Sequence, residues 1–496
     1  MKNATNDNSF IHGASYLPEK KAYIVFLVIV AIASLLRIYH LDSQMWLDEY
    51  STILLSLRRP WLDLVSGYAG PASHILFEVL ANWSSSLFGE SAWSIRLPAA
   101  LFGIAGVAML ARFATRIYTV KSGLFIAALM ALSYNHIFFS QDARGYTTLI
   151  FFFLWSSYLF LQIVESGQME KKTGILYCLA TVLTCYCQPF GVFVPASQSV
   201  IALALVVINA KTQDAESFPI KQFILWMIAA ALITLLFYAP KIDVMLEHAQ
   251  MNVDTPAEGP RFNIGLVIEI IEGLSAAFFG YVGLTIVSIA GAIGIIIWIR
   301  SNAVSFFILT LPIVIQGIVF FIMGFGIHPR YFAIAIPVIY VAGGITIFYL
   351  SGALLAKFVS SVTTRQFVHS VVLSLIVLVS AYPLIRYYSI PKQDYEGVLA
   401  MIEKLSAEED VRAGVQTVGS IMKDYYEADW VRIETLDDLL AQENTGKHVW
   451  VSMTLERIMA LADPTLVKHI HEHYRLVKSF PGTVGNGNIQ VYSKID

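Results

Sequence analysis

The chain has 496 residues, of which 56% are hydrophobic and 14% are charged, and its formal net charge is -3. Soluble globular chains carry about 25% charged residues, so this composition indicates that lipid surrounds most of the chain. The sequence contains no basic face, which excludes a nucleic-acid-binding protein. Several apolar runs reach the ~18 to 20 residues that a helix needs to cross a bilayer, and they predict a helical bundle.

Runs of apolar residues predict about eleven membrane-spanning helices. The first span follows Lys20 and Lys21 and leads into Arg37 without a small-residue cleavage site, so we interpret it as an uncleaved span rather than a signal peptide. The predicted spans lie near residues 22–39, 95–117, 122–139, 145–164, 173–188, 190–209, 222–240, 280–299, 303–323, 331–350 and 368–387.

Basic residues predict the orientation of these spans, because short cytoplasmic loops carry the excess of Lys and Arg. If the N-terminus is cytoplasmic, every even-numbered connection is basic, and the inside residues are Lys20, Lys21, Arg112, Arg116, Lys121, Lys171, Lys172, Lys211, Lys221, Arg300, Lys357 and Arg365. Eleven spans then place the C-terminus outside. We therefore predict a multi-pass protein of the plasma (inner) membrane with a cytoplasmic N-terminus and an extracytoplasmic C-terminus.

Two long outer segments and a C-terminal domain complete the predicted organisation. A transmembrane domain over residues 1–388 contains the extracytoplasmic loops 40–94 and 241–279, in which Ile264 to Phe279 is interpreted as an interfacial helix. Residues 389–496 have the composition of a small extracytoplasmic α/β domain. Its predicted strands are Val411 to Val418, His448 to Met453, Arg475 to Phe480 and Ile489 to Tyr492, with helices over Tyr395 to Leu405 and Leu455 to Leu461.

Ionisable residues cluster at the outer ends of the predicted spans. Each would cost about 2.5–3.5 kcal/mol at the bilayer centre, so those that are retained are candidates for function. Three outer connections contribute such residues, namely Arg37, Asp48 and Glu49, then Asp142 and Arg144, then His328 and Arg330.

Each of these candidates also has a structural interpretation. Asp48 and Glu49 point about 100° apart if they lie on a helix and so have different roles, but acidic residues also favour a first helical turn through the helix dipole. Asp142 and Arg144 could pair with each other in their short connection or bind a phosphate or sugar hydroxyl. Arg330 could offer a planar fork to phosphate or extend to the interface.

The order of several short motifs along the chain carries a family resemblance. The motifs are Arg37, Trp46-Leu47-Asp48-Glu49, Ile95-Arg96-Leu97-Pro98 with Gly103, Asp142-Ala143-Arg144 with Tyr146, and Arg330-Tyr331 with Pro337. In this order they resemble the membrane glycosyltransferases of the GT-C fold. The most similar branch contains protein O-mannosyltransferases and lipid A aminoarabinose transferases, and the resemblance spans residues 20 to about 345.

The resemblance implies a role for each matching residue. Asp48 would be the catalytic carboxylate, Glu49 would support the architecture or the acceptor, and Asp142 with Arg144 would lie near the reacting groups. Arg330 would bind the carrier phosphate. Many relatives carry a His-Pro-Pro stretch in the first outer loop, where this chain has Gly70-Pro71-Ala72-Ser73-His74, so no role is carried over to His74.

These assignments predict transfer of a sugar, with inversion, from a polyprenyl-phosphate carrier to a lipid, glycan or protein acceptor. Asp48 would act as the base for the acceptor hydroxyl, while Arg330, followed by Arg144, Arg261 and His328, would stabilise the departing phosphate. No nucleotide is implied. A divalent cation is compatible with this chemistry, but no metal-ligand cluster supports one, and the three cysteines lie in one apolar stretch.

Two other classes of protein remain open. A multi-pass transporter or lipid flippase is the main alternative, but such proteins bind their substrates near the bilayer midplane, often between repeated halves. This sequence shows no internal repeat, and its carboxylates gather on one predicted face. A non-catalytic scaffold would account for the C-terminal domain but not for the outer carboxylates.

Overall fold

The computed structural model describes residues 18–66, 73–212, 218–247, 280–323, 329–483 and 487–495. The predictions for Arg261, His328 and the interfacial helix over Ile264 to Phe279 therefore lie outside the described residues. The chain divides into two compact units. Unit 1 comprises residues 1–39, 60–89 and 95–383, and unit 2 comprises residues 40–59, 90–94 and 384–496.

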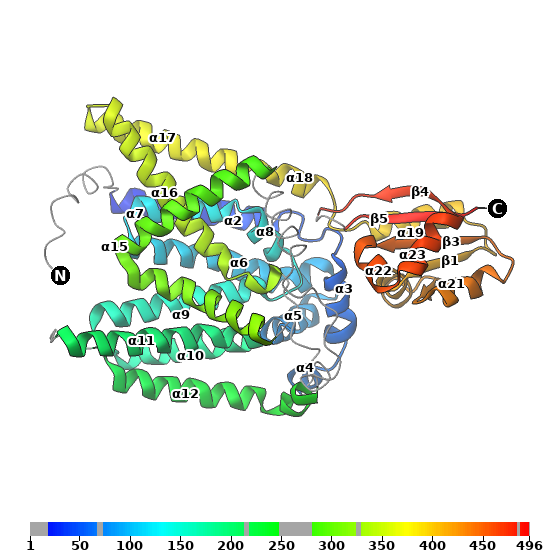
Figure 1. The fold of residues 1–496 in the computed structure, drawn as a ribbon, viewed down its shortest axis with the longest axis horizontal. Helices are drawn as coiled ribbons and strands as arrows, with labels where there is room; N and C mark the ends of the chain where they lie inside the picture. Colours follow the sequence, from blue (N-terminus) through cyan, green and yellow to red (C-terminus); the bar gives the residue numbers. More distant parts are fainter. Residues whose placement is uncertain are drawn as a thin grey trace. The chain divides into compact units, whose positions relative to one another are not determined.

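Unit 1 is a bundle of apolar helices (Figure 1). Its helices are α2 (Glu19–Ile38), α4 (Trp61–Ser66), α5 (Ile75–Phe88), α6 (Ala92–Ile117), α7 (Val120–Ala131), α8 (Tyr134–Ser140), α9 (Tyr146–Ser166), α10 (Lys171–Cys187), α11 (Phe193–Thr212), α12 (Ile220–Tyr238), α15 (Gly280–Met323), α16 (Ala335–Phe358) and α17 (Val362–Ser380). The described residues also form the short 3-10 helices η2 (Pro189–Val192), η3 (Ala239–Lys241) and η4 (Pro329–Phe332).

Each of the eleven predicted spans falls on helical segments, although not each on a separate helix. Among the described residues, eight helices are long and apolar enough to cross a membrane, or nine if α7 and α8 form one bent span. Helix α10 has 17 residues and is not among these helices. Helix α15 has 44 residues interrupted by non-helical Asn302. At 1.5 Å per residue it is about twice as long as the hydrocarbon core, so we count it as two spans.

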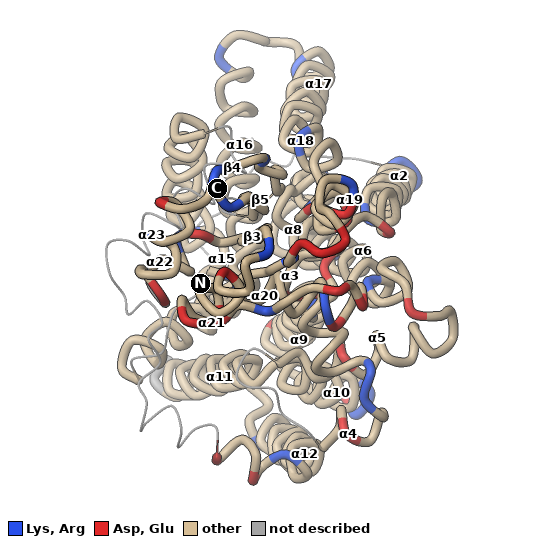
Figure 2. Tube along the Cα trace, turned by 90° about the vertical axis from the view of Figure 1, so that its right-hand side faces the viewer, with Lys and Arg blue, Asp and Glu red and all other residues tan. Residues whose placement is uncertain are grey.

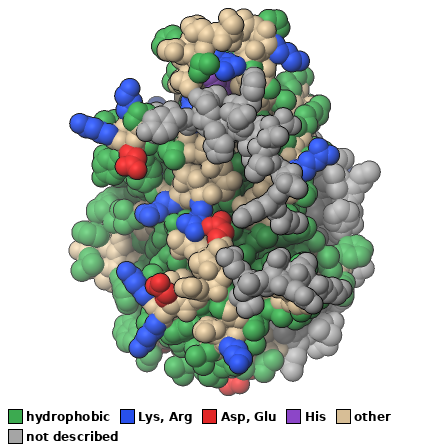
Figure 3. Space-filling view, turned by 90° about the vertical axis from the view of Figure 1, so that its left-hand side faces the viewer, with side chains coloured by type: hydrophobic (Ala, Val, Ile, Leu, Met, Phe, Trp, Pro, Cys, Tyr) green, Lys and Arg blue, Asp and Glu red, His purple; other side chains and the backbone are tan. Residues whose placement is uncertain are grey.

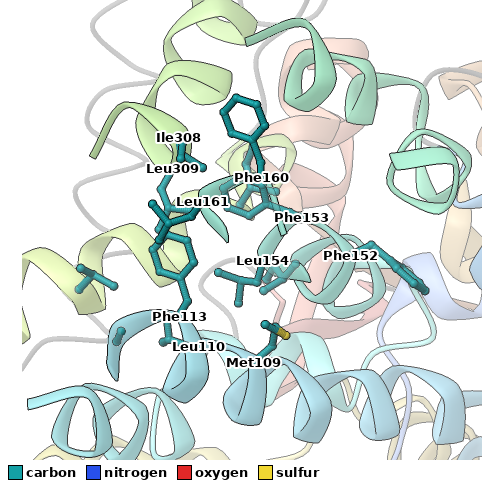
Figure 4. Close-up of a cluster of buried hydrophobic side chains, with 14 of the residues drawn as sticks. Met109, Leu110, Phe113, Phe152, Phe153, Leu154, Phe160, Leu161, Ile308 and Leu309 are labelled. Carbon is teal, nitrogen blue, oxygen red and sulfur yellow. The ribbon is translucent and has the colours of Figure 1, made fainter. Parts of the chain in front are cut away.

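A large apolar cluster joins α6, α9 and α15 at the centre of unit 1. Figure 4 shows Met109, Leu110 and Phe113 of α6 beside the aromatic and leucine side chains of α9, with Ile308 and Leu309 of α15. In α9, 72% of the residues of the most apolar segment are buried. In residues 220–247, which contain α12, the corresponding share is only 11%. Because lipid is as apolar as these side chains, close packing rather than removal from water holds the helices together.

The break between α7 and α8 is held by a buried arginine. The two helices meet at 62°, which frees backbone carbonyls that apolar surroundings cannot satisfy. Arg37 of α2 is fully buried and donates hydrogen bonds to the carbonyl oxygens of Met130 (3.4 Å) and Ala131 (3.1 Å) and to Ser140 Oγ (3.1 Å). Arg37 therefore supports the bundle, rather than acting as a free outer cation.

Many basic residues of unit 1 lie at helix ends on one face. They flank the α6–α7, α9–α10, α11–α12 and α16–α17 connections, and Arg300 lies just before Asn302 of α15. Figure 3 shows Lys and Arg side chains over this face of the molecule, with few carboxylates among them. This distribution agrees with the basic even-numbered connections expected from the sequence.

Unit 2 contains a five-stranded sheet with strand order β2-β1-β3-β5-β4. Strands β1 (Val411–Val415), β2 (Val431–Ile433) and β3 (Val449–Thr454) are parallel, whereas β4 (Tyr474–Phe480) and β5 (Ile489–Lys494) pair antiparallel. The helices are α3 (Leu47–Thr52), α18 (Pro383–Ser389), α19 (Tyr395–Leu405), α20 (Thr417–Ser420), α21 (Leu436–Glu443), α22 (Glu456–Ala462) and α23 (Pro464–His473), with π-helical turns η1 (Ile53–Leu57) and η5 (Ile421–Tyr425). The predicted α/β character is confirmed, and β2 is a strand that the sequence analysis did not predict.

Acidic residues begin several helices of unit 2 (Figure 2). Asp48 and Glu49 lie in the first turn of α3, Glu396 lies in that of α19, and Asp437 and Asp438 lie in that of α21. Negative charge at this end of a helix is stabilised by the helix dipole. Position in a first turn therefore does not by itself distinguish Asp48 from the other carboxylates of the unit.

Candidate functional site

Two arginines lie within electrostatic range of a buried histidine in unit 1. His74 precedes α5, is 1% exposed, and lies within electrostatic range of Arg144 and Arg330. Burial, together with the charges of the two arginines, holds the pKa of His74 well below its usual value. The imidazole is therefore neutral at physiological pH, and the positive charge of the cluster comes from the two guanidinium groups.

Local backbone features bring this cluster together. The His74 backbone N donates to Glu78 Oε1 (3.0 Å), which fixes the start of α5, and the His74 ring packs edge-on against Tyr146 (4.5 Å between centroids). At Gly145, a Cβ would lie only 2.9 Å from Phe77 Cβ and 3.0 Å from His74 Cβ. Glycine at this position thus allows the connection that carries Arg144 to approach α5.

Asp142 and Arg144 lie in the short connection between α8 and α9, as predicted. Asp142 is 3% exposed, and its carbonyl oxygen accepts from the Arg144 backbone N (2.7 Å). The neighbouring Gln141 binds the end of α2, where its Nε2 donates to the carbonyl oxygens of Arg37 (3.1 Å) and Tyr39 (2.6 Å). The connection is therefore anchored by Gln141, with a buried carboxylate and a cation beside the anchor.

In unit 2, the adjacent carboxylates Asp48 and Glu49 have different surroundings. Glu49 is fully buried, and its Oε1 accepts from Lys392 Nζ (2.8 Å) and from the Trp46 backbone N (2.8 Å). Asp48 is only partly buried, and its charge contributes to raising the pKa of the buried Tyr395, for which desolvation is the larger cause. Glu49 thus stabilises the start of α3, whereas Asp48 remains partly exposed.

The sequence analysis did not identify the residues that hold the Asp48 segment in place. Gln393 Oε1 accepts from the Leu47 backbone N (2.8 Å), and Gln393 Nε2 donates to Thr454 Oγ1 (3.0 Å) at the end of β3. Lys392 and Gln393 follow the last span directly, and 343 positions separate Lys392 from Glu49. The only available sequence signal was a polar pair that ends an apolar segment, and such pairs are common.

A cluster of tyrosines lies near Asp48. The hydroxyl groups of Tyr50 and Tyr426 are hydrogen bonded (2.8 Å), and the ring of Tyr50 also packs edge-on against Tyr395 and Tyr425, with centroids 5.2 and 4.7 Å away. Tyr425 and Tyr426 are partly exposed. Aromatic rings with polar tips beside a carboxylate suit a hydroxyl-bearing acceptor.

No group of three or more His, Cys, Asp or Glu side chains within the described ranges is arranged to hold a metal ion. All three cysteines, Cys178, Cys185 and Cys187, are free and buried.

Comparisons with known proteins identify the fold. Residues 73–242 match the family model described as dolichyl-phosphate-mannose-protein mannosyltransferase. Among solved structures, ArnT from Cupriavidus metallidurans in the apo state is similar, with 14% identity, a TM-score of 0.52, and coverage of 95% of this chain and 97% of that chain. A search of curated proteins finds no significant match.

The oligosaccharyltransferase of Archaeoglobus fulgidus is also similar to this chain. Its apo form gives 12% identity and a TM-score of 0.54, covering 92% of this chain and 73% of that chain. The archaeal oligosaccharyltransferase AglB from the same organism, in complex with an inhibitory peptide and a dolichol-phosphate, gives 12% identity and a TM-score of 0.52, with 96% and 74% covered.

The fold is therefore that of the GT-C membrane glycosyltransferases, and the resemblance stated from the sequence is confirmed. The matched family segment, residues 73–242, contains His74, Asp142 and Arg144.

Proposed function

We propose that this protein is a membrane glycosyltransferase that transfers a sugar, with inversion, from a polyprenyl-phosphate carrier to an acceptor on the extracytoplasmic face. The observation that carries the proposal is the cluster of Arg144 and Arg330 around buried His74, within a bundle of the GT-C fold. Cations preorganised where water is scarce stabilise a departing phosphate strongly. The archaeal AglB complex with a dolichol-phosphate supports a lipid-phosphate carrier.

The proposed reaction is a single displacement at the sugar carbon. Asp48 takes the proton of the acceptor hydroxyl, and the resulting oxygen forms a bond to the sugar carbon as the bond to the phosphate oxygen breaks. The electron pair of that bond leaves with the polyprenyl phosphate, whose added negative charge is stabilised by Arg330 and Arg144. Asp142 lies beside Arg144 and orients the reacting groups. The acceptor is a lipid, glycan or protein that reaches the membrane surface.

A transporter or lipid flippase would need polar substrate contacts near the bilayer midplane. Buried polar side chains do occur inside the bundle, where Gln198 Oε1 accepts from Tyr177 OH (2.6 Å) and Gln198 Nε2 donates to Ser156 Oγ (3.2 Å). These three side chains satisfy one another across α9, α10 and α11, as interhelical contacts in membranes do. They support packing and do not favour the transporter.

Turnover of labelled polyprenyl-phosphate sugars tests the proposal directly. Purified protein in lipid vesicles, supplied with a membrane extract as the source of acceptor, is expected to release polyprenyl phosphate and to label the acceptor fraction. Movement of the intact labelled lipid across the vesicle membrane, without cleavage of its sugar bond, would instead support a flippase.

The basic even-numbered connections predict the topology of the chain. Because Lys and Arg favour cytoplasmic loops, a reporter that is active only outside the cytoplasm should be active when fused after Asp496 and inactive when fused near Lys171. The opposite pattern of activity would place the candidate residues on the cytoplasmic side and contradict the proposed reaction face.

Substitution of Arg330 is expected to weaken binding of the donor, and the effect should be larger when both the positive charge and the planar guanidinium group are lost. Arg330→Ala removes both features, whereas Arg330→Lys keeps the charge, so the alanine variant should bind the donor more weakly than the lysine variant. Donor affinity is measured by titration in detergent. Arg365→Ala, a change near the start of α17, is the matched control. Equal affinity in all of these proteins would remove Arg330 from the site.

A further inference from the structure

Two buried neutral side chains of unit 1 have polar atoms without a protein partner. His74 and Gln188 are each 1% exposed. Within the part of the chain that the structure describes, neither ring nitrogen of His74 and neither amide atom of Gln188 has a hydrogen-bond partner. Leaving such a group unpaired costs roughly 1–3 kcal/mol, and most buried polar groups are satisfied. These two side chains therefore point to a bound group that the chain itself does not supply.

The two side chains lie in the same region of unit 1. Helices α5 and α10 pack together, and Glu78 in the first turn of α5 lies within electrostatic range of Tyr186, two residues before Gln188. On the other side of Gln188, the Phe190 ring lies 5.5 Å from the ring of Tyr331, which follows Arg330. The residues that flank Gln188 in the chain therefore approach the start of α5 on one side and η4 on the other.

The charges around His74 indicate what kind of group binds there. Arg144 and Arg330 supply two positive charges, and the neutral imidazole can donate a single hydrogen bond. The amide of Gln188 offers two further N–H donors. Fixed cations combined with neutral N–H donors suit an anion with several oxygen atoms, since charge provides attraction and the N–H groups provide direction.

We propose that His74 and Gln188 each donate a hydrogen bond to the phosphate of the polyprenyl-phosphate donor, between the guanidinium groups of Arg144 and Arg330. This inference rests on the proposed function. As the sugar departs, charge accumulates on the phosphate oxygens, so both hydrogen bonds strengthen in the transition state and assist the reaction. His74 is thus a residue of the donor site, although it replaces part of the motif seen in many relatives.

Binding of undecaprenyl phosphate, compared with undecaprenol, isolates the contribution of the phosphate. His74→Leu and Gln188→Leu are each expected to weaken undecaprenyl phosphate binding to the full-length protein in detergent by about tenfold or more, as expected for one hydrogen bond to a charged group. Binding of undecaprenol should not change. His74→Asn keeps an N–H donor and should retain most of the affinity, whereas Gln188→Glu adds negative charge and should bind more weakly than Gln188→Leu.

A second buried histidine of unit 1 provides the matched control. His369 is 3% exposed and lies 3.0 Å from Ser351 Oγ, between α16 and α17, so His369→Leu removes a buried imidazole elsewhere in the bundle. Its affinity for undecaprenyl phosphate should equal that of the wild type. Thermal unfolding of every variant shows which proteins are folded, and if His74→Leu does not fold, the comparison of Gln188→Leu with Gln188→Glu decides.

The outcomes separate this inference from the proposed function. If the wild type binds undecaprenol as tightly as undecaprenyl phosphate, the donor class fails, and with it the proposed function. If the wild type prefers the phosphate but folded His74 and Gln188 variants do so equally, only this inference is overturned. Displacement of the lipid by an equal concentration of inorganic phosphate would indicate a site for free phosphate and would overturn the assignment to the lipid.

Discussion

Asp48→Asn is expected to lower turnover by about 10² to 10⁴, the range for loss of a general base. Asparagine keeps the shape of the side chain and can still accept a hydrogen bond, but it cannot take the proton of the acceptor hydroxyl. Because the donor phosphate is assigned to the cations of unit 1, donor affinity should remain near that of the wild type. Turnover and donor binding are therefore measured in parallel on the purified protein.

A control carboxylate in the same unit distinguishes this role from a general effect of charge. Asp437 lies in the first turn of α21 and is exposed, so Asp437→Asn removes a carboxylate from an equivalent helix position. It should leave turnover unchanged. If Asp48→Asn retains more than about a tenth of wild-type turnover, the loss is below the range for a general base. Asp142→Asn should then show the larger effect, and wild-type rates in both variants would contradict the transferase mechanism.

Lys392→Met is expected to destabilise the protein by about 3–5 kcal/mol, because it leaves a buried carboxylate without its cation. The Glu49 and Lys392 side chains are 0% and 3% exposed, and their charged atoms lie 2.8 Å apart. Methionine has a similar length, so the main change is electrostatic. Thermal unfolding in detergent, followed through the near-ultraviolet signal of the aromatic residues, measures the effect.

The double variant Glu49→Gln/Lys392→Met tests whether the loss comes from the unpaired charge. Removing both charges should recover most of the stability, since a buried ion pair often stabilises little relative to neutral groups of similar volume. The double-mutant cycle gives the coupling between the two residues. Arg58→Met, which removes a partly exposed ion pair with Glu90 in the same unit, should cost no more than about 1 kcal/mol. A Lys392→Met protein as stable as Arg58→Met would contradict a structural role for Glu49.

Features that depend on neighbouring residues were predictable from the sequence. Apolar runs longer than a bilayer is thick predicted the spanning segments, and their flanking Lys and Arg predicted which connections share a face. Short apolar runs near Val411, His448, Arg475 and Ile489 predicted four of the five strands of unit 2. The three-residue strand β2 was too short to give such a pattern.

Features that depend on contacts between distant segments were not predictable. The sequence placed Arg37 among the candidates for function. In the structure, its guanidinium group donates hydrogen bonds to carbonyl oxygens at the break between α7 and α8, about 94 positions away. A break of this kind has no periodic pattern, because it depends on whether another helix supplies donors. His74 and Gln188 were likewise passed over, since their significance comes from burial without partners.

The sequence by itself determined that the chain is a multi-pass helical membrane protein, that its C-terminal region is an α/β domain, and that it resembles the GT-C glycosyltransferases. The length of the apolar runs, the asymmetry of the basic residues and the order of the motifs are properties of the sequence, so they can be recognised without a structure. Only the tertiary structure distinguished the surroundings of Asp48 and Glu49, through the pairing of Glu49 with Lys392, and brought Arg144 and Arg330 within electrostatic range of His74. Charge pairing and burial depend on packing between remote segments, so the spacing of residues along the sequence does not predict them.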